Sequence, residues 1–553
     1  MNKIFFKYQY LAIITICLIA FAPIFKNDFI NYDDPDYVLN NPYVKKINIE
    51  NIKQLIIGKG IDLYLPLTMV SYSVDYFVNG SNPILFHFTN LILHIFNSLV
   101  LLFILNKIIL KNDHIKYIIV LFFAINPLVT ESVCWIAQRK DMLYLLFYLL
   151  SINQYLNFEA TKKNKYLILC FIFFVLSCLS KPMAISLPFI ITLHVIFKSK
   201  KMILKNFVPF IAFYLVSIMF SVITIYRFKQ LEVLKSASIP NYSFLENLIT
   251  LFSEIGFYFF KPFLPINLSL FHMFPNSGEV LSNISLMLFS ILGIGLTLWI
   301  GWLIKTKNNK PTIYLFLAWL VFLTPILQII PNTHTYVSER YFYLSIVFPV
   351  AIVLYFIQNN IKTISNYKII FICLTIIFTI STFSRSKVWK NTETLFEQEL
   401  KLNPKNTIVL NNLAIYYNSK EKYDRAFPLF KKLIILEPSN EHYLSNYGIT
   451  LSKLRQIDSA IVYLEKSLAI NKQNYEAFSN LGICYIQNNL REKAFTCFLN
   501  AYKLNPDNAE IACNLGIYYF NSMEPDKALP LLEKAQNLGS PRALKYLNKL
   551  RNN

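Results

Sequence analysis

Three aspartates follow the first apolar segment of the chain, in the stretch Asp33-Asp34-Pro35-Asp36. A carboxylate held at a membrane face can accept the proton of a hydroxyl group that attacks a donor with a lipid-phosphate leaving group. Two adjacent carboxylates can divide this work, one acting as the base and the other orienting it. From the spacing alone, however, a turn or a helix cap before Pro35 is the favoured interpretation.

Other charged side chains stand near the ends of apolar segments that are predicted to open on the same side. They are Glu131, Arg139, Lys181, Glu339 and Arg340. The three cations suit a phosphate headgroup, and the acids, with Asp36, are predicted to support them. For any one residue, an ion pair that only fixes helix ends, such as Glu131 with Arg139, is about as favourable. Their convergence on one face favours the binding role.

The sequence offers no rival chemistry. Its histidines form no cluster, and no Ser/His/Asp set or group of metal ligands can be recognised. None of the eight cysteines lies in a CxxC motif, so neither a disulfide framework nor a zinc site is predicted.

The 553-residue chain is 55% hydrophobic and 16% aromatic, and only 15% of its residues are charged. A soluble protein could not cover its surface with this composition. Up to Phe383, the apolar residues gather into blocks of roughly 17 to 22 residues, the length that crosses a hydrocarbon core of about 30 Å. Eleven spans are predicted, near residues 8–25, 88–106, 117–136, 142–158, 166–180, 183–198, 206–226, 283–304, 312–330, 341–357 and 367–383.

The net charge of +21 invites a nucleic-acid-binding hypothesis, but the placement of the lysines argues against it. They lie in short clusters between the apolar blocks, which is the pattern of cytoplasmic loops. With a cytoplasmic N-terminus, as expected in a bacterial inner membrane, the segments 26–87, 227–282, 331–340 and everything after 384 fall outside. Residues 245–264 are predicted to form an interfacial helix, because prolines interrupt the run. Cleavage of a signal peptide near Ala20-Phe21-Ala22 is the alternative for the N-terminus.

From Thr407 onward the sequence repeats with a period of 34 residues, the length of a tetratricopeptide repeat. Four repeats are predicted, at 407–440, 441–474, 475–508 and 509–542, with a half-repeat before them and a polar cap after them. The chain is thus expected to divide into a membrane domain (1–390) and a repeat domain (391–553).

Asparagine recurs at the sixth position of each repeat, as Asn412, Asn446, Asn480 and Asn514. On the inner helices these side chains would form a ladder, and an amide can both donate to and accept from the backbone of an extended peptide. Asparagine is also common at this position in ordinary repeats, which makes a purely structural role the stronger alternative.

Six stretches, in order from residue 29 to 404, resemble the transmembrane and tetratricopeptide-repeat O-mannosyltransferases and their bacterial relatives, which are GT-C glycosyltransferases. They are FINYDDPDYVLNNPYV, YLPLTMVSYSVDYFVNGSNPILFHFTNLILH, INPLVTESVCWIAQRKDMLYLLFYLL, LSKPMAISLPFI, SERYFYLS and SRSKVWKNTETLFEQELKLNP. The resemblance implies a polyprenyl- or dolichyl-phosphate sugar donor, no metal requirement and an active site outside the cytoplasm. It also implies an aspartate of the first loop as catalytic base, which here is Asp33 or Asp34.

The sequence therefore predicts an all-α protein, with a GT-C-like bundle of about eleven transmembrane helices followed by a tetratricopeptide solenoid. Its predicted function is to move a hexose, with mannose the first candidate, from a lipid phosphate to an outside hydroxyl, such as Ser or Thr of a polypeptide held by the repeats. No cofactor and no nucleic-acid partner are expected. Two alternatives stay open: a non-catalytic membrane-anchored scaffold for envelope proteins, and a transferase that acts on glycan or lipid.

Overall fold

The computed structural model describes residues 2–61, 63–108, 113–199, 208–230, 242–276, 278–306, 309–327, 335–360 and 367–551. Across these ranges the chain is helical, apart from turns, loops and one antiparallel pair of short strands, β1 (His272–Met273) and β2 (Thr335–Val337). Contacts divide it into two compact units, Met1–Leu402 and Asn403–Asn553. The all-α prediction is confirmed.

The first unit extends past the boundary predicted at residue 390. It includes α18 (Thr392–Leu402), which was predicted to be a half-repeat leading into the solenoid. The buried carboxylate of Glu399 accepts hydrogen bonds from Ser269 Oγ (2.7 Å) and the Leu270 N–H (3.0 Å). Arg385 of α17 (Tyr367–Val388) lies 3.4 Å from its other oxygen. These contacts join α18 to the first unit.

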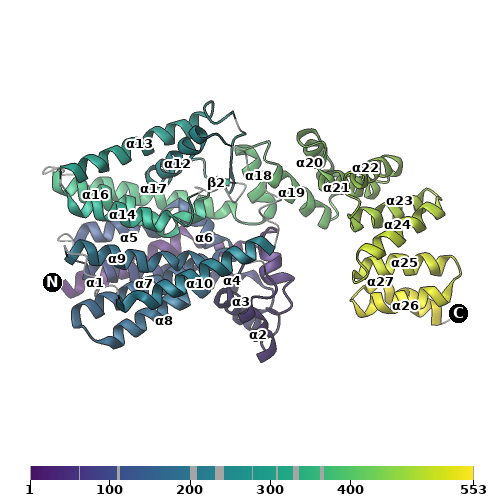
Figure 1. Cartoon of the computed structure of the whole chain (residues 1–553), viewed down its shortest axis with the longest axis horizontal. Coiled ribbons are helices and arrows are strands. Elements are labelled where there is room, and N and C mark those ends of the chain that lie inside the picture. Colours follow the sequence, from purple (N-terminus) through teal and green to yellow (C-terminus); the bar gives the residue numbers. More distant parts are fainter. Residues whose placement is uncertain are drawn as a thin grey trace. The chain divides into compact units, whose positions relative to one another are not determined.

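Long apolar helices make up most of the first unit, and Figure 1 shows many of them running alongside one another. Those not yet introduced are α1 (Asn2–Ala20), α4 (Pro83–Lys107), α5 (Asp113–Ile125), α7 (Arg139–Thr161), α8 (Asn164–Ser180), α9 (Leu187–Ser199), α10 (Ile211–Gln230), α12 (Phe244–Phe260), α13 (Ile284–Lys305), α14 (Lys310–Leu323) and α16 (Val347–Asn360). Shorter helices are α2 (Ile49–Ile57), α3 (Pro66–Asn79), α6 (Thr130–Cys134) and α15 (Phe342–Ser345), and single turns include η1 (Ala22–Lys26) and η5 (Pro182–Ser186).

Four described helices are long and apolar enough to cross a membrane: Pro83–Lys107, Val208–Arg227, Ile284–Lys305 and Ile370–Val388. The number rises to six if two bent helix pairs each form one span. These pairs are His114–Ile125 with Pro127–Cys134, bent by 47°, and Glu339–Ser345 with Val347–Gln358, bent by 51°. Four to six such helices fit a membrane protein. The count of eleven spans and their orientation stay predictions.

The first bend lies where Pro127 follows Asn126, because proline cannot continue the hydrogen bonding of the preceding helix. Polar side chains along one face of α4 bind the backbone carbonyls around this break. His94 Nε2 lies 2.9 Å from the Ala124 oxygen, Asn90 Nδ2 donates to the Trp135 oxygen (3.3 Å), and Asn97 Nδ2 donates to the Met142 oxygen (2.9 Å). Through these bonds α4 holds residues 126–141, which carry several predicted site residues.

The segment predicted to be an interfacial helix is α12, which begins with a capping box between Ser243 and Glu246. It packs closely along α13 at two glycines. A Cβ atom added to Gly256 would lie 1.9 Å from the Phe289 oxygen, and one added to Gly293 would lie 2.0 Å from the Phe252 oxygen. Only glycine permits so close an approach of the two backbones. Its position in a membrane interface stays a prediction.

The second unit consists of antiparallel helix pairs that follow the repeat period (Figure 1). They are α19 (Thr407–Ser419) with α20 (Tyr423–Leu436), α21 (Glu441–Lys453) with α22 (Ile457–Ile470), α23 (Tyr475–Gln487) with α24 (Arg491–Leu504), and α25 (Ala509–Asn521) with α26 (Pro525–Asn537), and α27 (Pro541–Arg551) follows. Within the third pair, Gly482 lies directly against the Phe498 ring, because a Cβ there would come within 2.7 Å of Phe498 Cε1. This explains the alternation of small and large residues in the repeats.

Candidate active site

Asp34 is fully buried, and backbone hydrogen bonds occupy both of its oxygens. Oδ2 accepts from the Ile30 N–H at 2.7 Å, and Oδ1 accepts from the Ala137 N–H at 2.8 Å. Burial raises the pKa of Asp34 to about 7, an effect that the two backbone N–H groups oppose. This carboxyl joins the first loop to the segment before α7 and is not accessible to a substrate.

Asp33, its neighbour, stays accessible, with 31% of its side chain exposed. Its Oδ2 lies 3.8 Å from Lys140 Nζ. The Lys140 ammonium donates a hydrogen bond to the Tyr37 hydroxyl (3.2 Å) and lies 4.8 Å from the centre of that ring. Of the two adjacent carboxylates, Asp33 is therefore the accessible one.

The first loop is held firmly around Asp33. The Asp28 N–H donates to the Lys390 oxygen (2.7 Å), and the Asn31 N–H donates to Thr392 Oγ1 (2.8 Å). The ring of Tyr32 packs against those of Trp135 and Phe271, with centres 5.8 and 5.6 Å away. The residues just before Asp33, and Asp34 after it, thus contact segments more than a hundred residues away in sequence, which restricts where the Asp33 carboxylate can point.

Arg340 and Glu131 form the second element of the site. Arg340 Nη1 lies 3.6 Å from Glu131 Oε1, and 24% of the arginine side chain is exposed against 2% of the glutamate. The guanidinium is close enough to Asp33 and Tyr32 to interact with both electrostatically. Arg340 therefore presents a partly exposed positive charge beside the candidate base, as predicted for a phosphate ligand.

Lys181 lies at the turn between α8 and η5, where its ammonium forms a short ion pair with Asp141. Asp141 also accepts a hydrogen bond from Ser132 Oγ (3.3 Å). The ammonium lies 5.4 Å from the centre of the Tyr341 ring, next to Arg340. The structure thus brings Lys181 toward the predicted cluster, with its charge compensated by Asp141.

Arg139 occupies a different environment from the one predicted. Its side chain is fully buried, and Nη2 lies 2.5 Å from Asp75 Oδ2. Nε donates to Asn90 Oδ1 (2.9 Å), Nη1 lies within hydrogen-bonding distance of both Ser71 oxygens, and Nη2 also donates to the Phe86 oxygen (3.0 Å). Acceptors from α3 and α4, the Asp75 carboxylate among them, thus surround the guanidinium. The phosphate role predicted for Arg139 is therefore corrected to a structural one.

Lys140 is a site residue that the sequence did not predict, whereas its neighbour Arg139 was predicted. Successive residues of an α-helix point about 100° apart, so the two side chains at the start of α7 cannot share one direction. Arg139 faces the interior of the bundle and Lys140 faces the first loop. Helical periodicity indicates that only one of the two can face Asp33, but it does not say which.

Two predicted supporting acids differ in their surroundings. Glu339 is buried, accepts from the Ser269 N–H (2.7 Å) and lies 3.5 Å from His272 Nε2, so it holds the segment of β1. Asp36 is exposed in the short turn η2 (Pro35–Leu39). Within the described ranges, no group of three or more His, Cys, Asp or Glu side chains is arranged to hold a metal ion.

The asparagine ladder is uneven. Asn412 and Asn480 each donate to a backbone carbonyl one turn back in their own helix, those of Ile408 (2.8 Å) and Glu476 (2.9 Å). Asn514 is buried, donates to Ser479 Oγ (3.0 Å) and accepts from Arg542 Nη1 (3.1 Å). Asn514 thus joins neighbouring repeats and the final helix. This is the purely structural role that was the alternative to peptide binding.

Comparison with known proteins points to one family. Mouse protein O-mannosyl-transferase TMTC1 is 33% identical over 133 residues, which cover 22% of this chain and 14% of that protein. Human TMTC1 is 37% identical over 92 residues, covering 17% of this chain and 10% of that protein. Mouse TMTC4 is 25% identical over 186 residues, covering 29% and 25% respectively. The matched regions span no more than a quarter of these relatives' own lengths.

The repeats have matches of their own. A tetratricopeptide repeat family model matches residues 442–474 and 475–508. MamA from Desulfovibrio magneticus RS-1 is 22% identical over 26% of this chain and 84% of that chain, with a TM-score of 0.24. YrrB, whose structure is titled a TPR protein with an unusual peptide-binding site, is 23% identical over 35% of this chain and 95% of that chain, also with a TM-score of 0.24. The resemblance found in the sequence motifs is confirmed: this chain is similar to the TMTC-type protein O-mannosyltransferases, and its C-terminal unit carries tetratricopeptide repeats.

Proposed function

We propose that this chain is a membrane-bound glycosyltransferase that moves a hexose, with mannose the first candidate, from a polyprenyl- or dolichyl-phosphate to a hydroxyl acceptor outside the cytoplasm. The observation that carries the proposal is the division of roles between the two adjacent aspartates. Asp34 is buried and held by two backbone N–H groups, whereas Asp33 is accessible between the cations of Lys140 and Arg340.

In the proposed reaction, Asp33 accepts the proton of the acceptor hydroxyl while that oxygen attacks the anomeric carbon of the sugar. The bond from this carbon to the phosphate oxygen breaks, and the lipid phosphate leaves with one more negative charge than it carried in the donor. A positive charge near that oxygen stabilises the transition state more than the ground state, which is the requirement for catalysis. Arg340 and Lys140 are the candidates for this role.

Charge balance supports these two cations over Lys181. The ammonium of Lys181 is already matched by the short contact with Asp141. Arg340 is separated by 3.6 Å from its acidic partner and remains partly exposed. Lys140 lies 3.8 Å from Asp33, so protonation of this base would release its charge toward the departing phosphate.

The acceptor is proposed to be a Ser or Thr hydroxyl of a polypeptide, because the similar proteins are named protein O-mannosyl-transferases and tetratricopeptide repeats commonly bind polypeptides. Asn412 and Asn480 each use an amide N–H within their own helix, and their side-chain oxygens are the groups proposed to accept from a bound peptide. If transfer to protein is unchanged in the double variant Asn412→Ala with Asn480→Ala, these two asparagines have no part in acceptor binding.

The proposal is tested with membranes that contain the wild-type chain, Asp33→Asn or Asp28→Asn, supplied with a radiolabelled polyprenyl-phosphate hexose. Asp28 is an exposed aspartate of the same loop, and its carboxylate accepts only a local bond from the next N–H (2.8 Å) among those described, so it provides a matched control. Asp33→Asn should abolish incorporation of label, and Asp28→Asn should leave it intact. Label incorporated at the wild-type rate by Asp33→Asn would exclude Asp33 as the base.

A further inference from the structure

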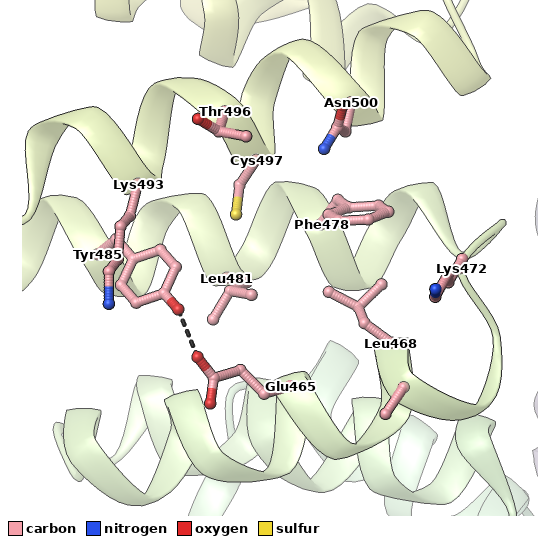
Figure 2. A pocket seen from close by; sticks show the side chains of 11 residues that line it. Glu465, Leu468, Lys472, Phe478, Leu481, Tyr485, Lys493, Thr496, Cys497 and Asn500 are labelled. Atoms are coloured by element: carbon pink, nitrogen blue, oxygen red, sulfur yellow. Dashed lines mark hydrogen bonds between the residues drawn. The ribbon is translucent and has the colours of Figure 1, made fainter.

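A groove crosses the second unit between two successive outer helices of its repeats. α22 and α24 form its walls and α23 forms its floor (Figure 2). Its volume of about 450 Å³ lies within the range of roughly 300–1,000 Å³ that is typical of ligand sites. The predicted asparagine ladder lies on the first helices of the repeats, whereas this groove opens between second helices, so the two features are distinct.

Two side chains at the groove are smaller than the aromatic residue at the same position of one neighbouring repeat, which leaves the space between them open. Cys497 stands where Tyr463 stands 34 residues earlier, and that tyrosine packs on the Tyr447 ring with centres 4.8 Å apart. Leu468 stands where Tyr502 stands 34 residues later, and that tyrosine packs against the core of the last repeat. Aromatic rings thus occupy the equivalent space on either side, while this groove stays open.

The interior of the groove is apolar. Leu481 and Leu468 line it beside Cys497, and these three side chains are only 4 to 8% exposed. Figure 2 shows them with the Phe478 ring between the two walls. A large apolar side chain that enters this space would leave water at both surfaces, which favours binding by roughly 25 cal/mol for each Å² of apolar area buried.

The groove is lined by two lysines and one glutamate. Lys493 and Lys472 stand at opposite ends of the lining in Figure 2, and both are exposed. The carboxylate of Glu465 accepts a hydrogen bond from the Tyr485 hydroxyl at 2.5 Å. The groove therefore has a cation at each end, and Glu465, the one acid among its lining residues, keeps its negative charge while it accepts a hydrogen bond within the wall.

On the wall formed by α24, Asn500 and Thr496 face the groove in Figure 2. Thr496 Oγ1 donates to the Glu492 oxygen of its own helix (3.1 Å). The amide of Asn500 carries both donor and acceptor atoms, the combination that a peptide bond requires.

We propose that this groove binds a short segment of a partner protein in which one large apolar side chain is flanked on both sides by acidic residues. The apolar side chain occupies the space between Leu481 and Cys497. The flanking carboxylates pair with Lys472 and Lys493, and the amide of Asn500 binds the peptide backbone. This interaction is independent of sugar transfer, because it uses neither the first-loop aspartates nor the cations beside them.

The test uses the full chain in lipid nanodiscs and fluorescence anisotropy with a panel of fluorescein-labelled nine-residue peptides. The central residue is Phe, Leu or Ala, and the two residues on each side are Glu, Gln or Lys. The wild-type chain should bind the Phe or Leu peptides with Glu flanks most tightly. Changing the flanks to Lys, or the centre to Ala, should weaken binding by at least about tenfold.

Two variants close the groove with residues that the neighbouring repeats already hold at the same positions, which is why the fold should tolerate them. Cys497→Tyr copies Tyr463, and Leu468→Tyr copies Tyr502. Both should lose binding. Lys493→Glu should lose it as well, whereas Lys527→Glu should not. Lys527 is the equivalent lysine one repeat later, where it pairs with Glu524 at 2.5 Å, and it provides the matched control.

Circular dichroism melting of each variant separates loss of binding from loss of fold, and if one closing variant unfolds, the other decides. The proposal is overturned if a folded closing variant binds as tightly as the wild-type chain, or if no member of the panel binds. Equal binding of Glu- and Lys-flanked peptides would also overturn it. Self-association of the wild-type chain that Cys497→Tyr abolishes, without peptide binding, would instead identify a second copy as the occupant.

Discussion

Removing the Asp34 carboxylate should destabilise the first unit without touching the proposed chemistry directly. In Asp34→Ala, the N–H groups of Ile30 and Ala137 lose their acceptor in a buried place. An unsatisfied buried donor costs about 1–3 kcal/mol, so the two together should lower the free energy of unfolding by about 2–6 kcal/mol. Asp34→Asn should have an intermediate effect, because its amide oxygen still accepts from one N–H while its NH₂ group faces the other.

The comparison variant is Asp33→Ala, whose side chain is 31% exposed and lies 3.8 Å from Lys140. Lys140 is buried, but this ion pair is long and Lys140 keeps its hydrogen bond to Tyr37, so loss of the Asp33 carboxylate should cost about 1 kcal/mol. Thermal unfolding of the purified chain in detergent should therefore show a lower Tm for Asp34→Ala and a nearly unchanged Tm for Asp33→Ala. Sugar transfer, measured below the Tm of every variant, should be lost in Asp33→Ala. A wild-type Tm for Asp34→Ala would refute its structural role, and a reversed order would refute the assignment of both aspartates.

Three further predictions follow from the same contacts. Because burial raises the pKa of Asp34 from 3.8 to about 7, the folded chain binds more protons than the unfolded chain between those values. The free energy of unfolding should therefore fall as pH rises from about 4 to about 7, and Asp34→Asn should flatten this trend in thermal scans. Arg340→Gln combined with Glu131→Gln, which avoids leaving a buried carboxylate unpaired, should lower kcat/KM for the lipid-phosphate sugar at least about tenfold with little change in Tm, as measured by initial rates. Arg139→Gln should cost about 3–5 kcal/mol of stability, seen as a lower Tm or loss of folded protein, because Asp75 is left buried without its partner.

The repeat register could be predicted from the sequence because it depends on local patterns. Small residues such as Gly482 recur every 34 positions, and each is matched by a large residue such as Phe498 in the second helix of the same repeat. Both members of such a pair lie within one unit of the period, so no long-range contact has to be known. The apolar blocks could also be predicted from the sequence, since the composition and length of one segment decide whether a helix can span a membrane.

The end of the first unit could not be predicted in the same way. The polar sequence after Val388 indicates the start of the soluble repeats, yet α18 is retained in the first unit by Glu399. That residue binds Ser269 and Leu270, about 130 positions earlier. No periodicity within α18 contains this information.

For the candidate site, the sequence alone predicted that carboxylates and cations gather at the ends of apolar segments, and its family resemblance implied that one of two neighbouring aspartates is the base. Tertiary structure distinguishes the two by burial, since Asp34 is buried and Asp33 is partly exposed. Asp34 is held in the interior by a hydrogen bond from the Ala137 N–H, 103 residues away. Arg139 is held there by its ion pair with Asp75, 64 residues away. Asp33 and Asp34, like Arg139 and Lys140, carry the same charge and are adjacent in the chain, but their side chains point in different directions. Which of them meets a substrate is set by the distant backbone that each one faces.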